Sequence, residues 1–320
     1  MRNSLARLAH RLYRSPTLLL ALAALFWAGN TVSGRLAVDE ITPLMLTSLR
    51  WVLVIAVLWP IHGAEVRRHW PAIRPKIGTI VLMAALGFTA FNVMFYIAAY
   101  YTSAVNLGIL QGAIPVFVLA GAFLYQGTRV SALQLVGVLA TTVGVLVVAS
   151  RGDPLSVFGG GWNRGDVMMI VSCVFYAFYT VALRERPDMP SAVFFTLLAL
   201  IAALTSLPLV AYEVVTGTLR LPSLQGFLVT LYVAIFPSFI SQIFWLRGVD
   251  LIGPGRAGVY VNLVPVFSAI LAVALLSEHF AAFHAVALVL VIGGILLAQR
   301  TPAQGGNVSD RSATHFDHEA

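Results

Sequence analysis

The sequence has few charged residues and a single cysteine. Charged residues make up 10% of its 320 positions and hydrophobic residues make up 59%, whereas charged residues make up about 25% of an average soluble domain. Cys173 has no second cysteine, which excludes an internal disulfide and a cysteine-based metal site. This composition excludes an ordinary soluble domain and predicts an integral membrane protein.

Carboxylates are scarce, and none falls in the middle of an apolar run. Near the outer membrane face we expect Asp39, Glu40, Asp153, Asp166, Glu213 and Glu278. Near the inner face we expect Glu65, Glu185, Asp188 and Asp250. Proton-coupled carriers usually retain an ionisable residue inside the membrane. The sequence therefore leaves the driving force open.

The residue patterns of a catalytic or metal centre are also missing. The sequence has no HExxH zinc motif, and its histidines are scattered near the ends of apolar runs: His10, His62, His69, His279 and His284. A polytopic membrane enzyme would need a concentrated catalytic set. We expect no enzyme activity and no cofactor.

What the sequence does contain is a series of apolar windows long enough to cross a bilayer, which takes about 20 residues. They lie at 17–36, 43–61, 77–98, 103–124, 131–150, 166–184, 191–212, 224–246, 255–276 and 281–299. The connections between them are short. These windows predict an all-α fold of ten transmembrane helices.

The placement of basic residues predicts the orientation. The formal net charge is +7, yet with the N-terminus in the cytoplasm only Arg35, Arg151, Arg164 and Arg220 fall on the outer side. The remaining basic residues in the connections and termini then fall inside, as the positive-inside rule requires. Both termini are predicted to be cytoplasmic. The positive net charge is thus explained by the orientation in the membrane and does not indicate nucleic-acid binding.

The chain repeats itself after about 150 residues. NVMFYIAAYYTSA at 92–104 aligns with QIFWLRGVDLIGP at 242–254, and IPVF at 114–117 aligns with VPVF at 264–267. LFWAGNTVSGR at 25–35 aligns with VFYAFYTVALR at 174–184. Each half contains five predicted spans, an odd number, so the second half must cross the membrane in the opposite sense. We expect two inverted five-helix repeats.

The expected domain organisation follows from this repeat. It comprises a basic N-terminus (1–16), a first repeat (17–150), an inter-repeat loop (151–165), a second repeat (166–299) and a polar tail (300–320).

The order and doubling of several segments resemble a known family. These segments are FWAGNTVSGR at 26–35, PLMLTSLRW at 43–51, YIAAYYTSA at 96–104, the paired I/V-P-V-F segments and LLSEHF at 275–280. Over residues 17–299 the chain resembles the ten-helix drug/metabolite transporters whose halves are called EamA domains. The resemblance implies a secondary transporter, commonly an exporter of amino acids, related metabolites or toxic compounds, in a bacterial inner membrane.

Polar and aromatic side chains within the spans mark candidate positions for a solute path, because polar groups in hydrocarbon persist mainly where they line a cavity or meet partners. The candidates are Trp27, Asn30, Arg50, Asn92, Tyr96, Gln111, Tyr176, Tyr179, Gln242, Trp245, Tyr260 and Asn262. If the two first helices of the repeats form walls of one cavity, Trp27 and Tyr176 should approach each other near the midplane.

Each candidate also has a structural interpretation. Trp27 and Tyr176 could be aromatic residues of the interfacial belt, although they lie deep in their spans. Asn30 and Asn92 could join neighbouring helices through hydrogen bonds. Arg50 could hold a solute carboxylate or a backbone carbonyl, and the resemblance implies a basic residue there in either case.

Prolines inside spans mark candidate hinges. Pro115, Pro237 and Pro265 each lack the amide hydrogen that continues a helix, so each is expected to bend its span. Pro115 and Pro265 are repeat mates, which suggests matching bends in an alternating-access cycle. A static bend that improves packing is the alternative.

The sequence and the resemblance together predict an exporter of small metabolites, such as amino acids or aromatic and amphipathic compounds. The expected partners are the solute and membrane lipids, in a monomer or a homodimer. A flippase for lipids or lipid-linked sugars is the alternative function.

Overall fold

The computed structural model of the chain describes residues 14–127, 130–153 and 163–299. Within these residues, ten helices are long and apolar enough to span a membrane, which confirms the predicted multi-pass all-α fold. The predicted N-terminus, inter-repeat loop and tail lie largely or wholly outside the described residues.

The first half contains five spans, some of them made of several helical segments. Its elements are α2 (Pro16–Leu36), α3 (Pro43–Arg68), α4 (Trp70–Ile73), η1 (Arg74–Lys76), α5 (Ile77–Ala84), η2 (Ala85–Ala90), α6 (Phe91–Ala98), α7 (Ala104–Gln111), α8 (Ile114–Gln126) and α9 (Ala132–Ala149). The segments α5, η2 and α6 form one continuous span, and α7 and α8 form another.

The second half repeats this pattern. Its elements are α11 (Arg164–Ala182), η3 (Leu183–Glu185), α12 (Ser191–Val215), α13 (Leu224–Val233), η4 (Ala234–Ile240), α14 (Ser241–Ile252), α15 (Pro254–Gly258), η5 (Val259–Asn262), α16 (Leu263–Leu276) and α17 (Ala282–Gln299). Five spans per half give the inverted repeat that the sequence predicts.

Local sequence explains many helix boundaries. Ser103, Ser131 and Ser223 each begin a helix by accepting a backbone N–H bond on the side chain, which satisfies an amide that the helix leaves unpaired. At the other end, Gly127 and Ser277 have left-handed backbones with φ of 63° and 53° and end α8 and α16. These two residues are repeat mates, so the same stop occurs in both halves.

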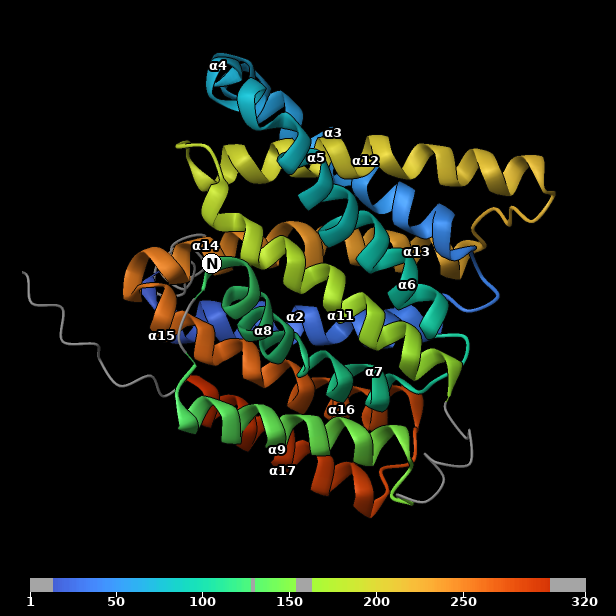
Figure 1. The fold of residues 1–320 in the computed structure, drawn as a ribbon. Helices are drawn as coiled ribbons and strands as arrows, with labels where there is room; N and C mark the ends of the chain where they lie inside the picture. The colour runs from blue at the N-terminus through green and yellow to red at the C-terminus, as the bar shows by residue number, and fades with distance from the viewer. Residues whose placement is uncertain (1–13, 128–129, 154–162, 300–320) are drawn as a thin grey trace, which may run out of the picture.

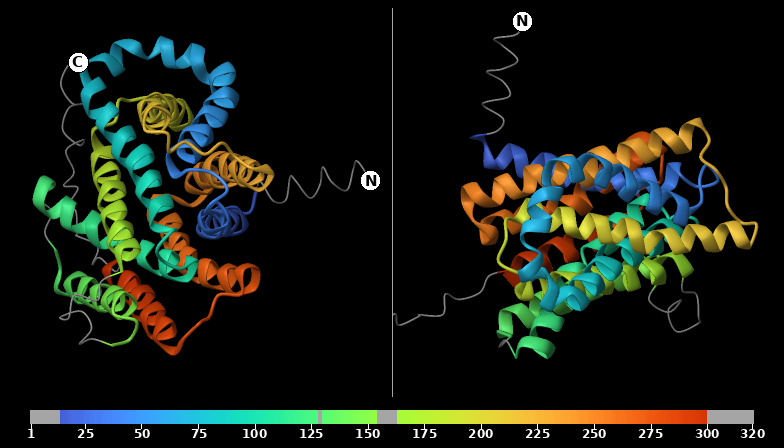
Figure 2. Two further views of the ribbon diagram at one scale, coloured as in Figure 1. Left: turned by 90° about the vertical axis from the view of Figure 1, so that its right-hand side faces the viewer. Right: turned by 90° about the horizontal axis from the view of Figure 1, so that it is seen from above.

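The two halves interlock rather than sit side by side. Helix α2 packs against α14 and α16 of the second half, and its counterpart α11 packs against α6 and α8 of the first half. Helices α3 and α12 pair along one side of the bundle, and α9 and α17 pair along the opposite side (Figure 1). The view in Figure 2 along the helices shows the remaining spans between these two pairs.

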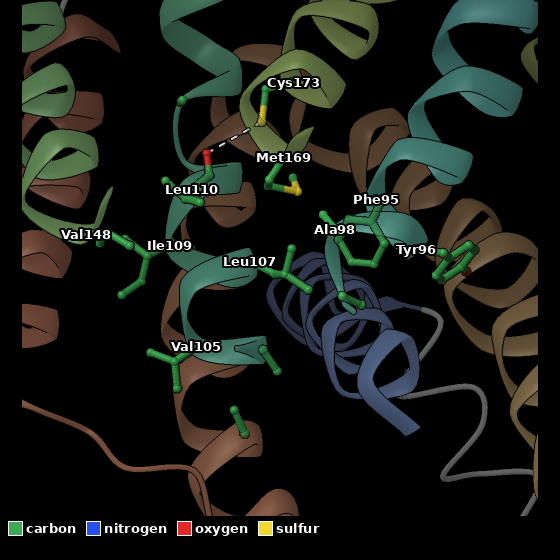
Figure 3. Packing of buried hydrophobic residues seen from close by; sticks show 14 of the residues in the cluster. Phe95, Tyr96, Ala98, Val105, Leu107, Ile109, Leu110, Val148, Met169 and Cys173 are labelled. Carbon is green, nitrogen blue, oxygen red and sulfur yellow. Dashed lines mark hydrogen bonds between the residues drawn. The ribbon is translucent and has the colours of Figure 1, made fainter. Parts of the chain in front are cut away.

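The largest buried cluster surrounds α7, where the halves meet. Figure 3 shows Leu107 and Leu110 among Met169, Cys173 and Phe95 from α11 and α6. The thiol of Cys173 is fully buried and donates to the carbonyl of Leu110 at 3.5 Å. The single cysteine is therefore part of the packed core.

The structure differs from the sequence expectation at the prolines. Pro115 and Pro265 lie in the first turns of α8 and α16, directly after the α-helix has been interrupted by a turn at Gly112 and by the 3₁₀ segment η5 that ends at Asn262. A proline in the first turn loses little, because that amide has no partner within the helix. Pro237 instead lies inside η4, a π-helical segment.

Two spans are also longer than expected. The helix predicted at 43–61 continues to Arg68 and the one predicted at 224–246 continues to Ile252. Polar residues extend both helices beyond the apolar window, and Pro60 is accommodated inside α3.

Candidate functional site

A cluster of hydrogen bonds surrounds the guanidinium of Arg50 inside the bundle. Nη1 donates to Asn92 Oδ1 at 2.7 Å, to the hydroxyl of Tyr96 at 2.7 Å and to Asn30 Oδ1 at 3.3 Å. Nε donates to the hydroxyl of Ser238 at 2.6 Å. Tyr96 donates in turn to Asn30 Oδ1 at 2.9 Å. Four sequence-predicted residues thus meet at one place, and Ser238 joins them from the second half.

Arg50 is buried without a counter-ion. Its exposed fraction is 6%, and no Asp or Glu among the described residues forms an ion pair with it. Its partners are neutral amides and hydroxyls, together with the ring of Trp51, whose centroid lies 5.3 Å from the guanidinium carbon. A buried charge without a counter-ion costs several kcal/mol, so these neutral hydrogen bonds are what compensates the burial of Arg50.

Two π-helical segments border the Arg50 cluster, and they are repeat mates. η2 contains Gly87 and η4 contains Pro237, which lie 150 positions apart. A π-helical turn leaves carbonyls without their usual partners. Side chains from neighbouring helices take these bonds: Trp51 Nε1 donates to the carbonyl of Phe88 at 3.2 Å, and Trp27 Nε1 donates to that of Pro237 at 3.0 Å.

The aromatic candidates form two groups instead of one. The ring of Trp27 lies 5.4 Å from that of Trp245, whereas Tyr176 lies 5.1 Å from Phe91 and 5.4 Å from Tyr179. No ring pair joins Trp27 to Tyr176 in the described part of the chain, so the expected approach of these two side chains is wrong. The reason is the interlocked packing, because α2 and α11 each face the third span of the opposite half.

The remaining candidates lie apart from Arg50. Gln242 lines a cavity of about 120 Å³ between α3, α12 and α14, whose other walls are largely apolar. Gln111 lies at the break between α7 and α8, where its Nε2 is buried without a partner. Tyr260 donates to Thr17 at 3.1 Å, and Asn262 donates to Gln299 at 3.2 Å. The structure gives these last two local partners rather than a shared site.

Sequence reasoning missed Ser238, Phe88 and Trp51. Serine in a transmembrane helix commonly bonds to its own backbone, as Ser238 also does to Val233 at 2.6 Å. The one available signal was position, because Ser238 directly follows a proline whose repeat mate is a glycine. Among the residues that the structure describes, no group of three or more His, Cys, Asp or Glu side chains could hold a metal ion.

Comparison with known proteins identifies the family. The model of the EamA-like transporter family matches residues 14–150 and 163–299, once per half. The match covers most of the chain, so the protein belongs to the EamA-like transporter family.

Relatives with transporter names cover nearly the whole chain. An uncharacterized transporter of Archaeoglobus fulgidus is 29% identical over 88% of this chain and 96% of its own length. The uncharacterized transporter YetK of Bacillus subtilis is 23% identical over 87% and 84%. The uncharacterized inner membrane transporter YedA of Escherichia coli K12 is 25% identical over 87% and 89%. These relatives indicate a membrane transporter rather than an enzyme.

A solved crystal structure has the same fold. It superposes with a TM-score of 0.61 at 19% identity and covers 89% of this chain and 96% of its own. At this identity the similarity supports the fold alone.

Proposed function

We propose that the protein is a secondary transporter that exports small metabolites carrying a carboxylate and an apolar portion, such as amino acids or aromatic acids. The observation that carries this proposal is the buried Arg50 cation with only neutral partners. A guanidinium binds a carboxylate through two parallel bonds, and such bonds are about twice as strong as neutral ones.

Aromatic rings near Arg50 favour a solute with an apolar portion. Trp51 lies against the guanidinium, and Phe88, Tyr179 and Tyr176 continue from it as a chain of rings with centroid separations of 4.9 to 5.4 Å. Ligand sites commonly combine such apolar walls with a few placed polar groups. A dianionic sugar phosphate would call for more basic residues than Arg50 alone.

Alternating access is supported by the position of this cluster at the contact between the halves. Arg50, Asn30, Asn92 and Tyr96 belong to the first half and Ser238 to the second. A movement of one half against the other would change the bonds to Arg50. A carboxylate that replaces Ser238 as a partner would bind one arrangement better than the other, which is the requirement for a coupled cycle.

The direction and orientation are part of the same proposal. The bundle end formed by Arg35, the α6–α7 connection and Glu278, here called the Glu278 end, faces the outside. The opposite end, which carries Arg67, Arg68 and Arg184, faces the cytoplasm together with both termini. The distribution of basic residues supports this orientation.

A flippase receives little support from the cavity beside Gln242, the one nearest the Arg50 cluster. The opening beside Gln242 has a volume of about 120 Å³, whereas sites for drug-sized ligands measure roughly 300 to 1,000 Å³. A lipid would therefore need a larger rearrangement than a small acid. Transport that occurs only with particular lipid headgroups would favour the flippase instead.

Uptake of radiolabelled amino acids and aromatic monocarboxylic acids into reconstituted vesicles tests the proposal. Arg50→Gln should weaken the apparent affinity for the transported acid about 10- to 100-fold, which corresponds to one charged hydrogen-bond pair. Arg50→Lys should keep part of it. Arg220→Gln is the control, because Arg220 is an exposed cation that pairs with Asp39 far from the cluster. An unchanged affinity in well-folded Arg50→Gln would overturn the carboxylate site.

A further inference from the structure

A second cavity lies away from Arg50, at the Glu278 end. Its volume is about 570 Å³, and its walls include Thr102 and Asn106 from the region where α6 turns into α7. The charged and titratable side chains around it are Arg35, Arg151, Glu278, His279 and His284, with Tyr100 and Tyr101. This cavity brings solvent to polar groups that the proposed solute site does not use.

Asp166 lies behind this wall and has no exposed surface. Its Oδ1 atom accepts a bond from the hydroxyl of Thr102 at 2.5 Å and a longer one from Asn106 Nδ2 at 3.5 Å. Its Oδ2 atom is buried and has no hydrogen-bond partner. The carboxyl is therefore only half satisfied, and its two partners are the side chains that separate it from the cavity.

Arg151, in the wall of the cavity, is a charged neighbour that favours the ionised form of Asp166, but it forms no ion pair with the carboxyl among the described residues. The polar groups in direct contact with Asp166 carry no charge. Asn106 Nδ2 also donates to Thr102 at 3.0 Å, so Asn106 Oδ1 is an acceptor and must receive its 3.1 Å bond from His284 Nε2–H. The other ring nitrogen of His284 accepts the backbone N–H of Ala281 at 3.0 Å. This arrangement holds His284 as the neutral tautomer, because a proton on Nδ1 would break the bond from Ala281.

Arg35, at the end of α2, also lines the cavity but does not contact Asp166. Arg35 donates to the carbonyl of Ala99, and its Nε lies 3.9 Å from Glu278. Glu278 itself accepts the backbone N–H groups of Ala104 and Val105 at the start of α7. No ion pair to Asp166 occurs in the described part of the chain.

We propose that Asp166 is a proton-binding site, loaded from the cavity at the Glu278 end and protonated in the conformation seen here. Burial with one oxygen unpaired disfavours the ionised carboxylate relative to the neutral acid. A proton from solution forms an O–H bond at Oδ2 and takes the charge from −1 to zero. No other reactant is needed.

Loading and release require two conformations with different proton affinity. Asp166 ties α11 to the α6–α7 turn through Thr102 and Asn106. When these elements separate, water reaches Oδ2, the carboxylate is solvated and the proton leaves. A ligand shifts an equilibrium between two conformations only if it binds them with different affinities. The different proton affinity of Asp166 in the two conformations would therefore couple a proton to the transport cycle. The coupling, unlike the proton site, rests on the proposed function.

Glu213 is a matched control from the same end of the bundle. It is also buried, with 5% exposed, and its carboxylate accepts the hydroxyl of Thr42 at 2.7 Å. The backbone N–H groups of Leu44 and Met45 also bond to this carboxylate. Glu213 therefore has the satisfied environment of an ordinary buried carboxylate.

Infrared spectroscopy of the full chain in lipid vesicles tests the proton site directly. At neutral pH the wild type should show a protonated-carboxyl stretching band that disappears in Asp166→Asn and persists in Glu213→Gln. The band should vanish as the pH is raised, and Asp166→Asn should unfold at nearly the same temperature as the wild type. Absence of such a band from acidic to neutral pH, or its loss in Glu213→Gln alone, would overturn the proposal.

Transport measurements test the coupling separately, once the vesicle screen has supplied a solute. A pH gradient should drive accumulation in the wild type, whereas Asp166→Asn should exchange solute across the membrane without accumulating it. Wild-type transport that ignores the pH gradient would overturn the coupling while the transporter assignment stands. Absence of any wild-type transport would instead count against the proposed function, and the infrared result would still decide the proton site.

Discussion

The Nε atom of Arg50 lies 2.6 Å from the hydroxyl oxygen of Ser238 and joins the two halves of the chain inside the bundle. The same hydroxyl donates to the carbonyl of Val233 at 2.6 Å. One serine therefore links the buried cation to the π-helical segment η4. A change in the shape of η4 would therefore change the hydrogen bonding of Arg50 in the candidate site.

Removal of this hydroxyl should destabilise the protein. Ser238→Ala is expected to lower the free energy of unfolding by about 1.5 to 3 kcal/mol, because a buried cation loses one of its acceptors. Thermal unfolding in detergent measures the change. Ser206→Ala is the control, since Ser206 is also fully buried but donates only to Ala203 within its own helix. Equal losses in both variants would show that the bond to Arg50 contributes nothing.

Two adjacent glycines in α17 should respond differently to alanine. A Cβ on Gly294 would lie 2.5 Å from the carbonyl oxygen of Gly137 in α9, whereas one on Gly293 would meet nothing within 4 Å. Gly294→Ala should lower the free energy of unfolding by about 1 to 3 kcal/mol through overpacking. Gly293→Ala should leave it unchanged or raise it by up to about 1 kcal/mol. Unfolding curves of both variants in detergent check this prediction. Equal stability would mean that α9 and α17 move apart to accept the Cβ without a loss in the free energy of unfolding.

The fold was predictable because its signals are local or periodic. The ten apolar windows follow from the thickness of a bilayer, and the 150-residue repeat is visible in segments such as IPVF and VPVF. The predicted ends failed where polar residues continue a helix, as from His62 to Arg68 in α3. Apolarity marks the part of a helix that contacts lipid and not the end of its hydrogen bonding.

The site was predictable only in part, because contacts across the repeat depend on how the halves interlock. Arg50, Asn30, Asn92 and Tyr96 were found as polar residues within spans, and the structure brings them together. The expected meeting of Trp27 with Tyr176 assumed that repeat mates face each other. Each of them instead meets an aromatic ring in the third span of the opposite half, Trp245 for Trp27 and Phe91 for Tyr176.

The orientation can be tested by labelling single cysteines in a Cys173→Ala background. Thr218 and Arg68 are exposed at opposite ends of the bundle. A membrane-impermeant maleimide should label Thr218→Cys on intact cells and Arg68→Cys only after permeabilisation, because the basic end is expected in the cytoplasm. The reverse pattern would place the Glu278 end inside and would invert the proposed direction of proton entry.

The prolines at the helix breaks should matter for the transport cycle more than for insertion. Pro115 and Pro265 follow the interruptions of two repeat-related spans. Alanine at either position supplies an amide hydrogen that can bond to the carbonyl four residues earlier, which favours one continuous helix over a broken one. Pro115→Ala and Pro265→Ala should slow transport about tenfold, equivalent to about 1.4 kcal/mol in the barrier, while membrane abundance stays normal.

Pro60 and Pro208 provide the matched comparison for that measurement. They lie inside the uninterrupted helices α3 and α12, so alanine there restores a helical bond without closing a break. Initial rates of uptake into vesicles, at equal protein content, should be near wild type for Pro60→Ala and Pro208→Ala. Wild-type rates in Pro115→Ala and Pro265→Ala as well would show that the breaks are static features of packing, and a loss of abundance in these two would make them folding determinants instead.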